Sequence, residues 1–276
     1  MFPARRAFRG IDLIAVNTIR AEPHYRRAAF DAGLEKVGYQ LRNGGDPQNR
    51  DDVILLWNLH GANEQRAREW EAKGGTVLVC ENGYIGRDAA GQQLYAIAVH
   101  GHNGSGWFPV GAEDRFETLG IQLAPWRAGG AGILICGQRG IGSRQMASPA
   151  QWEDKTLRRF KEQKLTGVRI RRHPGKNATA TPLEQDLADA GLCVIWSSAS
   201  GVKALTMGIP VVYCAPHWIC AGAAGHSIGT IHEPVCDDAR RLAALRRMAH
   251  AQWRVAEIEQ GEPFRRILDS IGSATW

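Results

Sequence analysis

The chain has 276 residues, of which 44% are hydrophobic and 22% charged, a composition typical of a folded globular protein rather than a disordered one. No apolar run approaches the roughly 20 residues of a membrane span, and the basic first ten residues lack the apolar core of a signal peptide. We therefore expect a cytoplasmic protein without membrane contact, and the net charge of +6 favours polyanionic partners slightly.

The first half of the chain alternates apolar segments with helical ones. We predict strands at residues 11–18, 53–57, 76–80 and 94–99, and helices at 23–37 and 62–73. Gly38 and the pair Gly74-Gly75 would end the two helices. Residues 111–130 carry no strong period and are predicted to connect two domains.

The second half repeats the alternation. We predict strands at residues 132–136, 167–171, 192–196 and 211–214, and helices at 151–163, 182–190, 202–207, 237–254 and 263–271. Two such series predict an α/β fold of two Rossmann-like parallel-sheet domains that face a cleft. We expect the domains at 1–115 and 130–250, with 251–276 as a C-terminal helix that packs back toward the first domain.

The cysteine pattern argues against a disulfide framework or a zinc site. The six cysteines lie far apart without a C-x-x-C pair, and four of them are in or beside apolar strand candidates. There is also no D-x-D motif, because the acidic pairs Asp51-Asp52 and Asp237-Asp238 are adjacent. The sequence therefore implies no required metal ion or other cofactor.

Polar and glycine-rich segments follow most of the predicted strands. They are Asn58 and His60, residues 81–83, 100–106 and 137–143, His173-Pro174, and residues 197–201. In parallel α/β sheets, ligands bind beyond the carboxyl ends of the strands. These segments therefore predict a binding cleft between the two domains.

Residues 191–213 predict a complete strand, turn, helix, turn and strand. Ser198, Ser200 and Gly201 lie at the predicted helix start, where hydroxyls and unpaired N–H groups suit an anion. Gly208 ends this helix and Pro210 follows it. The alternative interpretation is an ordinary, well-capped crossover.

Two other segments suit a phosphate. The turn at 137–143 places Arg139 and Gly140 where backbone N–H groups could face an anion, although it is neither a P-loop nor a G-x-G-x-x-G motif. Arg171, Arg172 and His173 at a strand end could clamp a diphosphate. The alternatives are a flexible loop for the turn and a solvated basic strand end for the arginines.

The strand end Arg172-His173-Pro174, followed by Ser-Ser-Ala-Ser-Gly-Val-Lys-Ala-Leu-Thr-Met-Gly-Ile-Pro-Val-Val at 197–212, resembles the C-terminal domain of GT-B glycosyltransferases. The resemblance is closest to the capsule-polysaccharide type and to phage-encoded, DNA-modifying relatives, and it is specific over residues 132–213. Residues 81–84, 102–107 and 251–264 are similar to segments of phage glycosyltransferase-like proteins.

The resemblance implies that the C-terminal domain binds a nucleotide-sugar donor, with a UDP-sugar as the first expectation, and that the N-terminal domain binds the acceptor. It assigns contacts with the donor diphosphate to His173, Ser198, Ser200 and Gly201. We add Arg139, Gly140 and Arg171 to this donor site from their positions at strand ends.

Transfer to a hydroxyl group needs a general base. Glu81, at the end of a predicted strand, is our first candidate for this catalytic residue, and His102 in the next strand-end loop is the second. His60 is a weaker third candidate. A solvent-facing glutamate and a structural histidine are the alternative interpretations.

Arg240, Arg246 and Arg247 lie on one predicted helix and are candidates for nucleic-acid contact, although a solvated helix face is the alternative. With the phage-like segments, they favour double-stranded DNA as the acceptor, and the base would have to leave the duplex to react. The preferred function is sugar transfer from a nucleotide-diphosphate donor to a 5-hydroxymethylpyrimidine in phage DNA, in the host cytoplasm. Alternatives are a surface-polysaccharide or lipid-linked glycan acceptor, a non-catalytic DNA-binding protein and a nucleotide-sugar epimerase.

Overall fold

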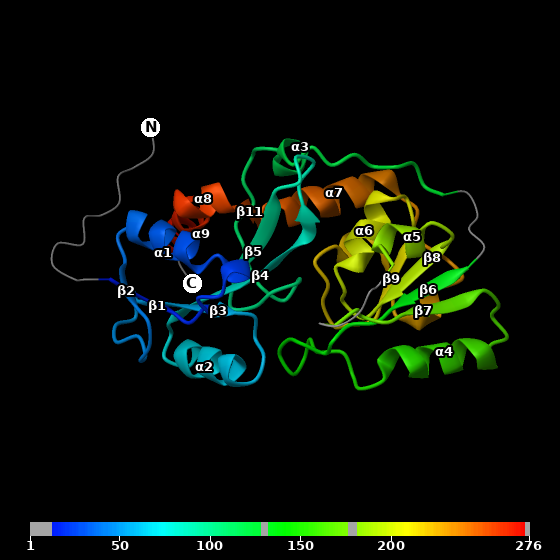
Figure 1. Cartoon of the computed structure of the whole chain (residues 1–276), viewed down its shortest axis with the longest axis horizontal. Coiled ribbons are helices and arrows are strands. Elements are labelled where there is room, and N and C mark those ends of the chain that lie inside the picture. The colour runs from blue at the N-terminus through cyan, green and yellow to red at the C-terminus, as the bar shows by residue number, and fades with distance from the viewer. Residues whose placement is uncertain (1–12, 128–131, 176–180, 274–276) are drawn as a thin grey trace.

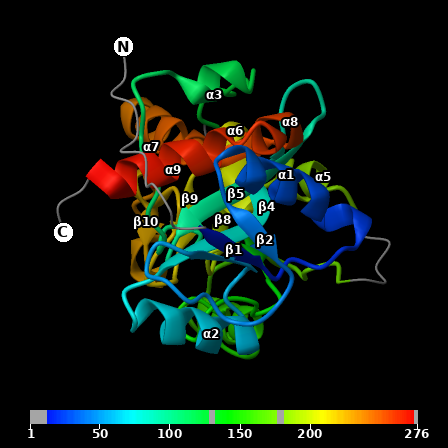
Figure 2. The same ribbon diagram turned by 90° about the vertical axis from the view of Figure 1, so that its left-hand side faces the viewer.

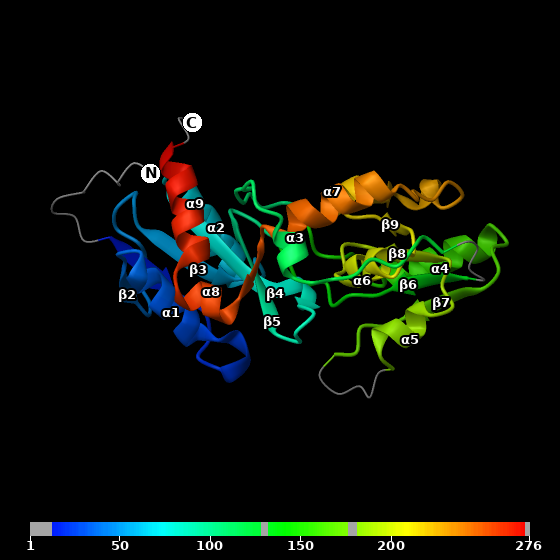
Figure 3. The ribbon, with the colours of Figure 1, turned by 90° about the horizontal axis from the view of Figure 1, so that it is seen from above.

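A computed structural model describes residues 13–127, 132–175 and 181–273 (Figure 1). Residues 11 and 12 of the first predicted strand, and the predicted domain limits at 1, 130 and 276, lie outside these ranges. Two sheets lie side by side along the long axis of the molecule, each with helices packed against it (Figures 1 and 3). The predicted α/β class, with two Rossmann-like and mostly parallel sheets, is confirmed.

The first sheet has six strands in the order β11-β5-β4-β3-β1-β2. They are β1 (Ile14–Asn17), β2 (Gln40–Arg42), β3 (Val53–Trp57), β4 (Thr76–Arg87), β5 (Gln93–Val99) and β11 (Gln252–Arg254). The first four are parallel, whereas β5 is antiparallel to β4 and β11 is antiparallel to β5. The prediction of parallel pairing was wrong for β5, because residues 88–92 are too few for the crossover that a parallel pair needs.

Helices cover both faces of the first sheet (Figure 2). They are η1 (Pro23–Tyr25), α1 (Arg27–Lys36), α2 (Ala62–Glu71), α8 (Val255–Glu259) and α9 (Glu262–Ser273). One face packs Phe30 of α1 and Phe264 of α9 against Leu55, while the other packs Trp70 of α2 against Ile54. This alternation along β3 follows from the two-residue period of a strand.

The second sheet has five parallel strands in the order β10-β9-β8-β6-β7. They are β6 (Ile133–Cys136), β7 (Val168–Arg171), β8 (Leu192–Ile195), β9 (Val211–Tyr213) and β10 (Gly225–His226). The helices are α4 (Trp152–Glu162), α5 (Leu183–Leu187), α6 (Ser200–Thr206) and α7 (Asp238–Ala249), with short 3-10 turns at η2 (Ala221–Ala223) and η3 (Ile228–Thr230).

The ends of two helices show how local sequence directs the chain. α6 ends before Gly208, as predicted, where φ is +72° and a Cβ atom would lie 1.9 Å from the Pro125 carbonyl oxygen. The helix predicted at 237–254 is wrong at its C-terminal end, because α7 stops at Ala249. The next residues enter the first sheet as β11, where Trp253 is 1% exposed. Burial of this tryptophan outweighs continuation of the helix.

The two sheets share one hydrophobic core. A single cluster of buried side chains joins Ala96 and Ala98 of β5 to Trp218, Ile219 and Leu245 beside the second sheet. The short helix α3 (Arg115–Thr118) adds Arg115, which pairs with Glu257 at 2.9 Å and lies over the Trp253 ring. The sheets are therefore held together by packing as well as by chain connection. Across the described residues, no helix is long and apolar enough to cross a membrane.

Candidate active site at the junction of the two sheets

Glu81 lies inside β4 rather than at a strand end, so its predicted position was wrong. Pairing of β4 with β3 ends at Cys80, opposite Trp57, while pairing with the antiparallel β5 continues through Glu81 and Asn82. This hairpin extends β4 beyond the predicted limit of residue 80. Glu81 therefore still follows directly on the parallel part of the sheet, at its carboxyl edge.

His102 lies beside Glu81. The segment after β5 turns back on itself, with a bridge between Val99 and Trp107, and buries His102 to 6% exposure. Nδ1 of His102 is 3.2 Å from Oε1 of Glu81. Burial alone would lower the pKa of His102, but the Glu81 carboxylate outweighs burial and raises the pKa above its ordinary value of 6.5. The two predicted catalytic residues thus form a buried acid–histidine pair.

Tyr84 completes this group, and sequence reasoning missed it. Residues 81 and 84 would face opposite sides of a regular strand, but the register of β4 and β5 shifts between Asn82 and Arg87. The Tyr84 hydroxyl donates to Oε1 of Glu81 at 2.5 Å and accepts from the backbone N–H of Asn103 at 2.7 Å. Burial and the nearby carboxylate raise the pKa of Tyr84 well above 10.0, so it remains a donor at neutral pH.

Asn103 ties this group to the second sheet. Its Nδ2 donates to the carbonyl oxygen of Ser197 at 2.6 Å, and its Oδ1 accepts from the N–H of Ile219 at 3.4 Å. Ser197 follows β8, and its N–H donates to Oε1 of Gln138, which follows β6, at 3.1 Å. Asn103, Ser197 and Gln138 lie in three of the segments predicted to form the cleft, although none of them was singled out as a site residue. The carboxyl ends of β6 and β8 are thereby connected to the loop that carries His102.

The glycine-rich turn at 137–143 also reaches His102. A Cβ atom added to Gly142 would lie 3.7 Å from Cε1 of the His102 ring. Within the described residues, Nε2 of His102 is buried and has no hydrogen-bond partner. Buried polar atoms almost always have a partner, so an unpaired one needs an explanation. Seven other buried side-chain nitrogens in the described residues, from tryptophan, arginine and glutamine, are also unpaired, but of the eight only Nε2 of His102 can accept a proton.

The predicted donor residues Ser198, Ser200 and Gly201 follow Ser197 directly. The Ser198 hydroxyl oxygen accepts from the N–H and the hydroxyl of Ser200, at 3.2 and 2.9 Å. Gly201 is buried, and a Cβ atom there would lie 2.8 Å from the Trp218 ring. The structure therefore places this serine-rich segment at the junction of the sheets, near Asn103 and Gln138.

A second cluster lies at the ends of β6 and β7. Burial and the charges of Arg139 and Arg171 lower the pKa of His173, whose Nδ1 accepts from the N–H of Gly175. Arg171 pairs with Asp186 on α5, and Arg139 and His173 are exposed. Arg139 is followed by Gly140, at a φ of +66°. These residues form a positive region on the same edge of the sheet, separate from the Glu81–His102 pair.

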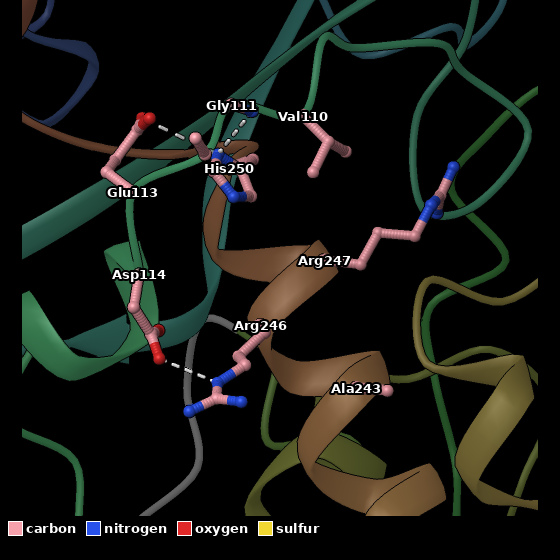
Figure 4. A pocket seen from close by; sticks show the side chains of 9 residues that line it. Val110, Gly111, Glu113, Asp114, Ala243, Arg246, Arg247 and His250 are labelled. Carbon is pink, nitrogen blue, oxygen red and sulfur yellow. Dashed lines mark hydrogen bonds and ion pairs between the residues drawn. The ribbon is translucent and has the colours of Figure 1, made fainter.

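The remaining candidates belong to neither cluster. His60 is exposed in the turn before α2. On α7, Arg246 pairs with Asp114 at 2.6 Å (Figure 4). The Arg247 guanidinium lies 4.9 Å from the Phe108 ring centroid, and Arg240 donates to the Gly222 carbonyl. In the part of the chain that the structure describes, no group of three or more His, Cys, Asp or Glu residues is arranged to hold a metal ion.

No protein-family model matches the sequence, and no curated protein matches it significantly. Two solved structures from Thermosulfurimonas dismutans are similar to this fold. The KpsC beta Kdo 2,7 transferase is 13% identical, with a TM-score of 0.50 over 95% of this chain and 100% of that chain. The KpsC beta Kdo 2,4 transferase is 12% identical, with a TM-score of 0.52 over 87% of this chain and 91% of that chain. At such identities the likeness is one of fold.

Proposed function

We propose that the protein is a glycosyltransferase that moves a sugar from a nucleotide-activated donor to a hydroxyl group, at the junction of its two sheets. The observation that carries the proposal is the buried Glu81–His102 pair, whose unpaired Nε2 lies beside the glycine-rich turn. The similarity in fold to two Kdo transferases supports the same class of reaction.

In this proposal His102 is the general base. The acceptor hydroxyl gives its proton to Nε2 as its oxygen attacks the anomeric carbon of the donor, and the bond from that carbon to the leaving phosphate breaks with its electron pair on the phosphate. Nδ1–H donates to Glu81, whose carboxylate stabilises the imidazolium that forms. Tyr84 holds Glu81 in place. Removal of such a base typically costs a factor of about 10² to 10⁴ in rate.

The leaving phosphate needs positive charge and hydrogen-bond donors. We assign it to the edge formed by the ends of β6, β7 and β8, where Arg139 is exposed and Arg171, which pairs with Asp186, lies near His173. Ser198, Ser200 and Gly201 follow β8 on the same edge, although the N–H groups of Ser200 and Gly201, which were predicted to be unpaired, both donate to oxygen atoms of Ser198. The donor in this assignment is a nucleotide-diphosphate sugar, with UDP as the first nucleotide to test.

For the acceptor we propose a glycan, which the sequence favoured second, after hydroxymethylated DNA. The two similar structures are named as Kdo transferases, which favours saccharide chemistry on this scaffold. The three arginines assigned to nucleic acid have different local partners, one of them an aspartate, and so offer less charge to a duplex than their number indicates. Hydroxymethylated DNA remains the second proposal, and the same experiment tests it.

A donor and acceptor screen tests the function. UDP-, GDP- and CMP-sugars are incubated with the protein and with either an oligosaccharide or duplex DNA that carries 5-hydroxymethylcytosine, and the products are read by mass spectrometry. We expect transfer to the oligosaccharide and a loss of about 10² to 10⁴ in kcat for His102→Gln. His232→Gln, at an exposed histidine, is the matched control.

Each other outcome of the screen has a defined meaning. Transfer to DNA would establish the second proposal, and donor isomerisation without any acceptor would indicate an epimerase. Full transfer by His102→Gln would exclude the assignment of the base. Absence of donor turnover by the wild-type protein across the whole screen would contradict the function.

A further inference from the structure

Two pockets flank the exposed side of α7 and share Ala243 and Arg247 as lining residues. The first, drawn in Figure 4, lies against residues 110–114 and has a volume of about 460 Å³. The second lies against the segment after β9 and has a volume of about 510 Å³. We call the second one the α7 groove; its lining includes Gly104, Tyr213, His217, Trp218, Arg240 and Arg247.

Apart from Arg247, which both pockets share, the charged side chains of the first pocket lie within ion-pair distance of one another or of Arg266. Arg246 is 2.6 Å from a carboxylate oxygen of Asp114, and His250 is 3.7 Å from Glu113. Arg266 also pairs with Glu113. Figure 4 shows Arg246 directed toward Asp114 and Arg247 directed away from both acidic residues. This pocket offers little unbalanced charge to a ligand.

The α7 groove differs because its cations have no acidic partner. Arg240 donates from Nε to the Gly222 carbonyl at 2.8 Å, and the Arg247 guanidinium lies over the Phe108 ring. Within the described ranges, neither arginine forms an ion pair with a carboxylate, and no acidic residue lines the groove. The exposed His217 is also part of the lining. The groove therefore carries a net positive charge that a bound anion would balance.

The spacing of the two arginines indicates an extended ligand. They are seven residues apart on one helix, which corresponds to about 10 Å along its axis. A ligand that extends along the helix can contact both. The lining also contains Tyr213 and Trp218, which are 9% and 3% exposed and so form part of the wall behind the groove rather than its surface. A groove of this volume fits a few sugar rings rather than a DNA duplex.

The groove also adjoins the candidate active site. Gly104 lines it and is two residues from His102, and a Cβ atom at Gly104 would lie 2.5 Å from the Trp218 carbonyl carbon. Ile219, another lining residue, donates its N–H to Asn103. The same turn of residues 102–105 thus forms part of the groove wall and carries the proposed base.

We propose that the α7 groove binds an acidic saccharide, whose carboxylate or phosphate groups pair with Arg240 and Arg247. Its role as the acceptor site rests on the proposed function, since Gly104 in its lining is two residues from the proposed base His102. The binding itself needs neither donor nor turnover.

Calorimetric titration of the full chain tests the proposal, with tetragalacturonate as the acidic probe and maltotetraose as a neutral probe of equal length. We expect the acidic probe to bind, the neutral one to bind at least tenfold more weakly, and added salt to weaken acidic binding. Arg240→Ala and Arg247→Ala should each weaken it about tenfold, the loss of one charge-assisted hydrogen bond. Arg158→Ala, on the exposed face of α4, is the matched control.

Equal binding of both probes, or unchanged binding by the Arg240 and Arg247 variants, would overturn the proposal. A DNA duplex that displaces tetragalacturonate, with equal losses for Arg240→Ala, Arg246→Ala and Arg247→Ala, would overturn it in favour of nucleic acid. His102→Gln separates the two proposals, because it should lower transfer without changing the binding of tetragalacturonate. If the wild-type protein binds tetragalacturonate but shows no transfer, the assignment of the groove stands and the proposed glycosyltransferase function is contradicted.

Discussion

At the scale of single residues, His102 has opposite requirements for stability and for the proposed catalysis. Its raised pKa means that the charged imidazole pairs favourably with Glu81 in the folded protein. This contribution to stability is fully present below the unfolded pKa near 6.5 and is lost as the pH rises through the higher folded pKa. A general base must instead be neutral. Activity should therefore rise over the pH range in which this part of the stability falls.

Tyr84 gives a prediction on stability at the same scale. Tyr84→Phe removes the donor to Glu81 and leaves the Asn103 N–H without its acceptor in a buried place. We expect the free energy of unfolding in urea to fall by about 1–3 kcal/mol. The matched control is Tyr25→Phe, at a half-buried tyrosine whose ring packs on Trp57. An equal, small loss in both variants would contradict the role of the Tyr84 hydroxyl.

At the scale of elements, the loop after β5 is the part that connects the base to the second sheet. Gly104 in this loop has a φ of +93°, and its α-carbon lies against the backbone of Trp218. The close approach places Asn103 within hydrogen-bond distance of Ser197. The loop therefore depends on a residue without a side chain at position 104.

Gly104→Ala tests this dependence against a matched glycine. Gly38 has the same φ of +93° but has no atom within 4 Å of an added Cβ, so Gly38→Ala measures the backbone strain alone. We expect Gly104→Ala to lower the free energy of unfolding by about 1–3 kcal/mol more than Gly38→Ala, because of the added clash. Thermal and urea unfolding of both variants measure the difference. Equal losses would mean that the contact with Trp218 is not needed.

Local patterns predicted some elements well and missed others for physical reasons. The run Val-Ile-Leu-Leu-Trp gave β3 at residues 53–57, because continuous apolar residues fit a strand buried on both faces. The second half of β4 has no such pattern, and the Tyr84 N–H there donates to the side-chain oxygen of Gln252, 168 residues away. The pair Glu81 and His102 was predicted as two separate candidates. Their contact comes from the β4–β5 hairpin, which strand periodicity does not reveal.

At the scale of the whole molecule, contacts between distant segments join the two sheets into one body. Asn103 and Ser197 are 94 residues apart in the sequence, so no local sequence motif contains both partners of their hydrogen bond. On another side of the junction, the Arg144 N–H donates to the carboxylate of Glu64 at the start of α2. Arg115 holds the C-terminal segment through Glu257. No property of the sequence alone predicts these pairings, whereas the two α/β series that they join are evident from it.

The pH dependence of transfer in the wild-type protein and in Glu81→Gln tests whether the Glu81–His102 pair supplies the base. We expect kcat of the wild type to rise with pH through a pKa above 6.5, the raised pKa of His102. Glu81→Gln removes the carboxylate that raises the pKa of His102, so the rise of kcat should move to lower pH while the maximal kcat falls. A wild-type kcat that does not rise in this way, or a rise at the same pH in Glu81→Gln, would contradict the assignment of the base to this pair.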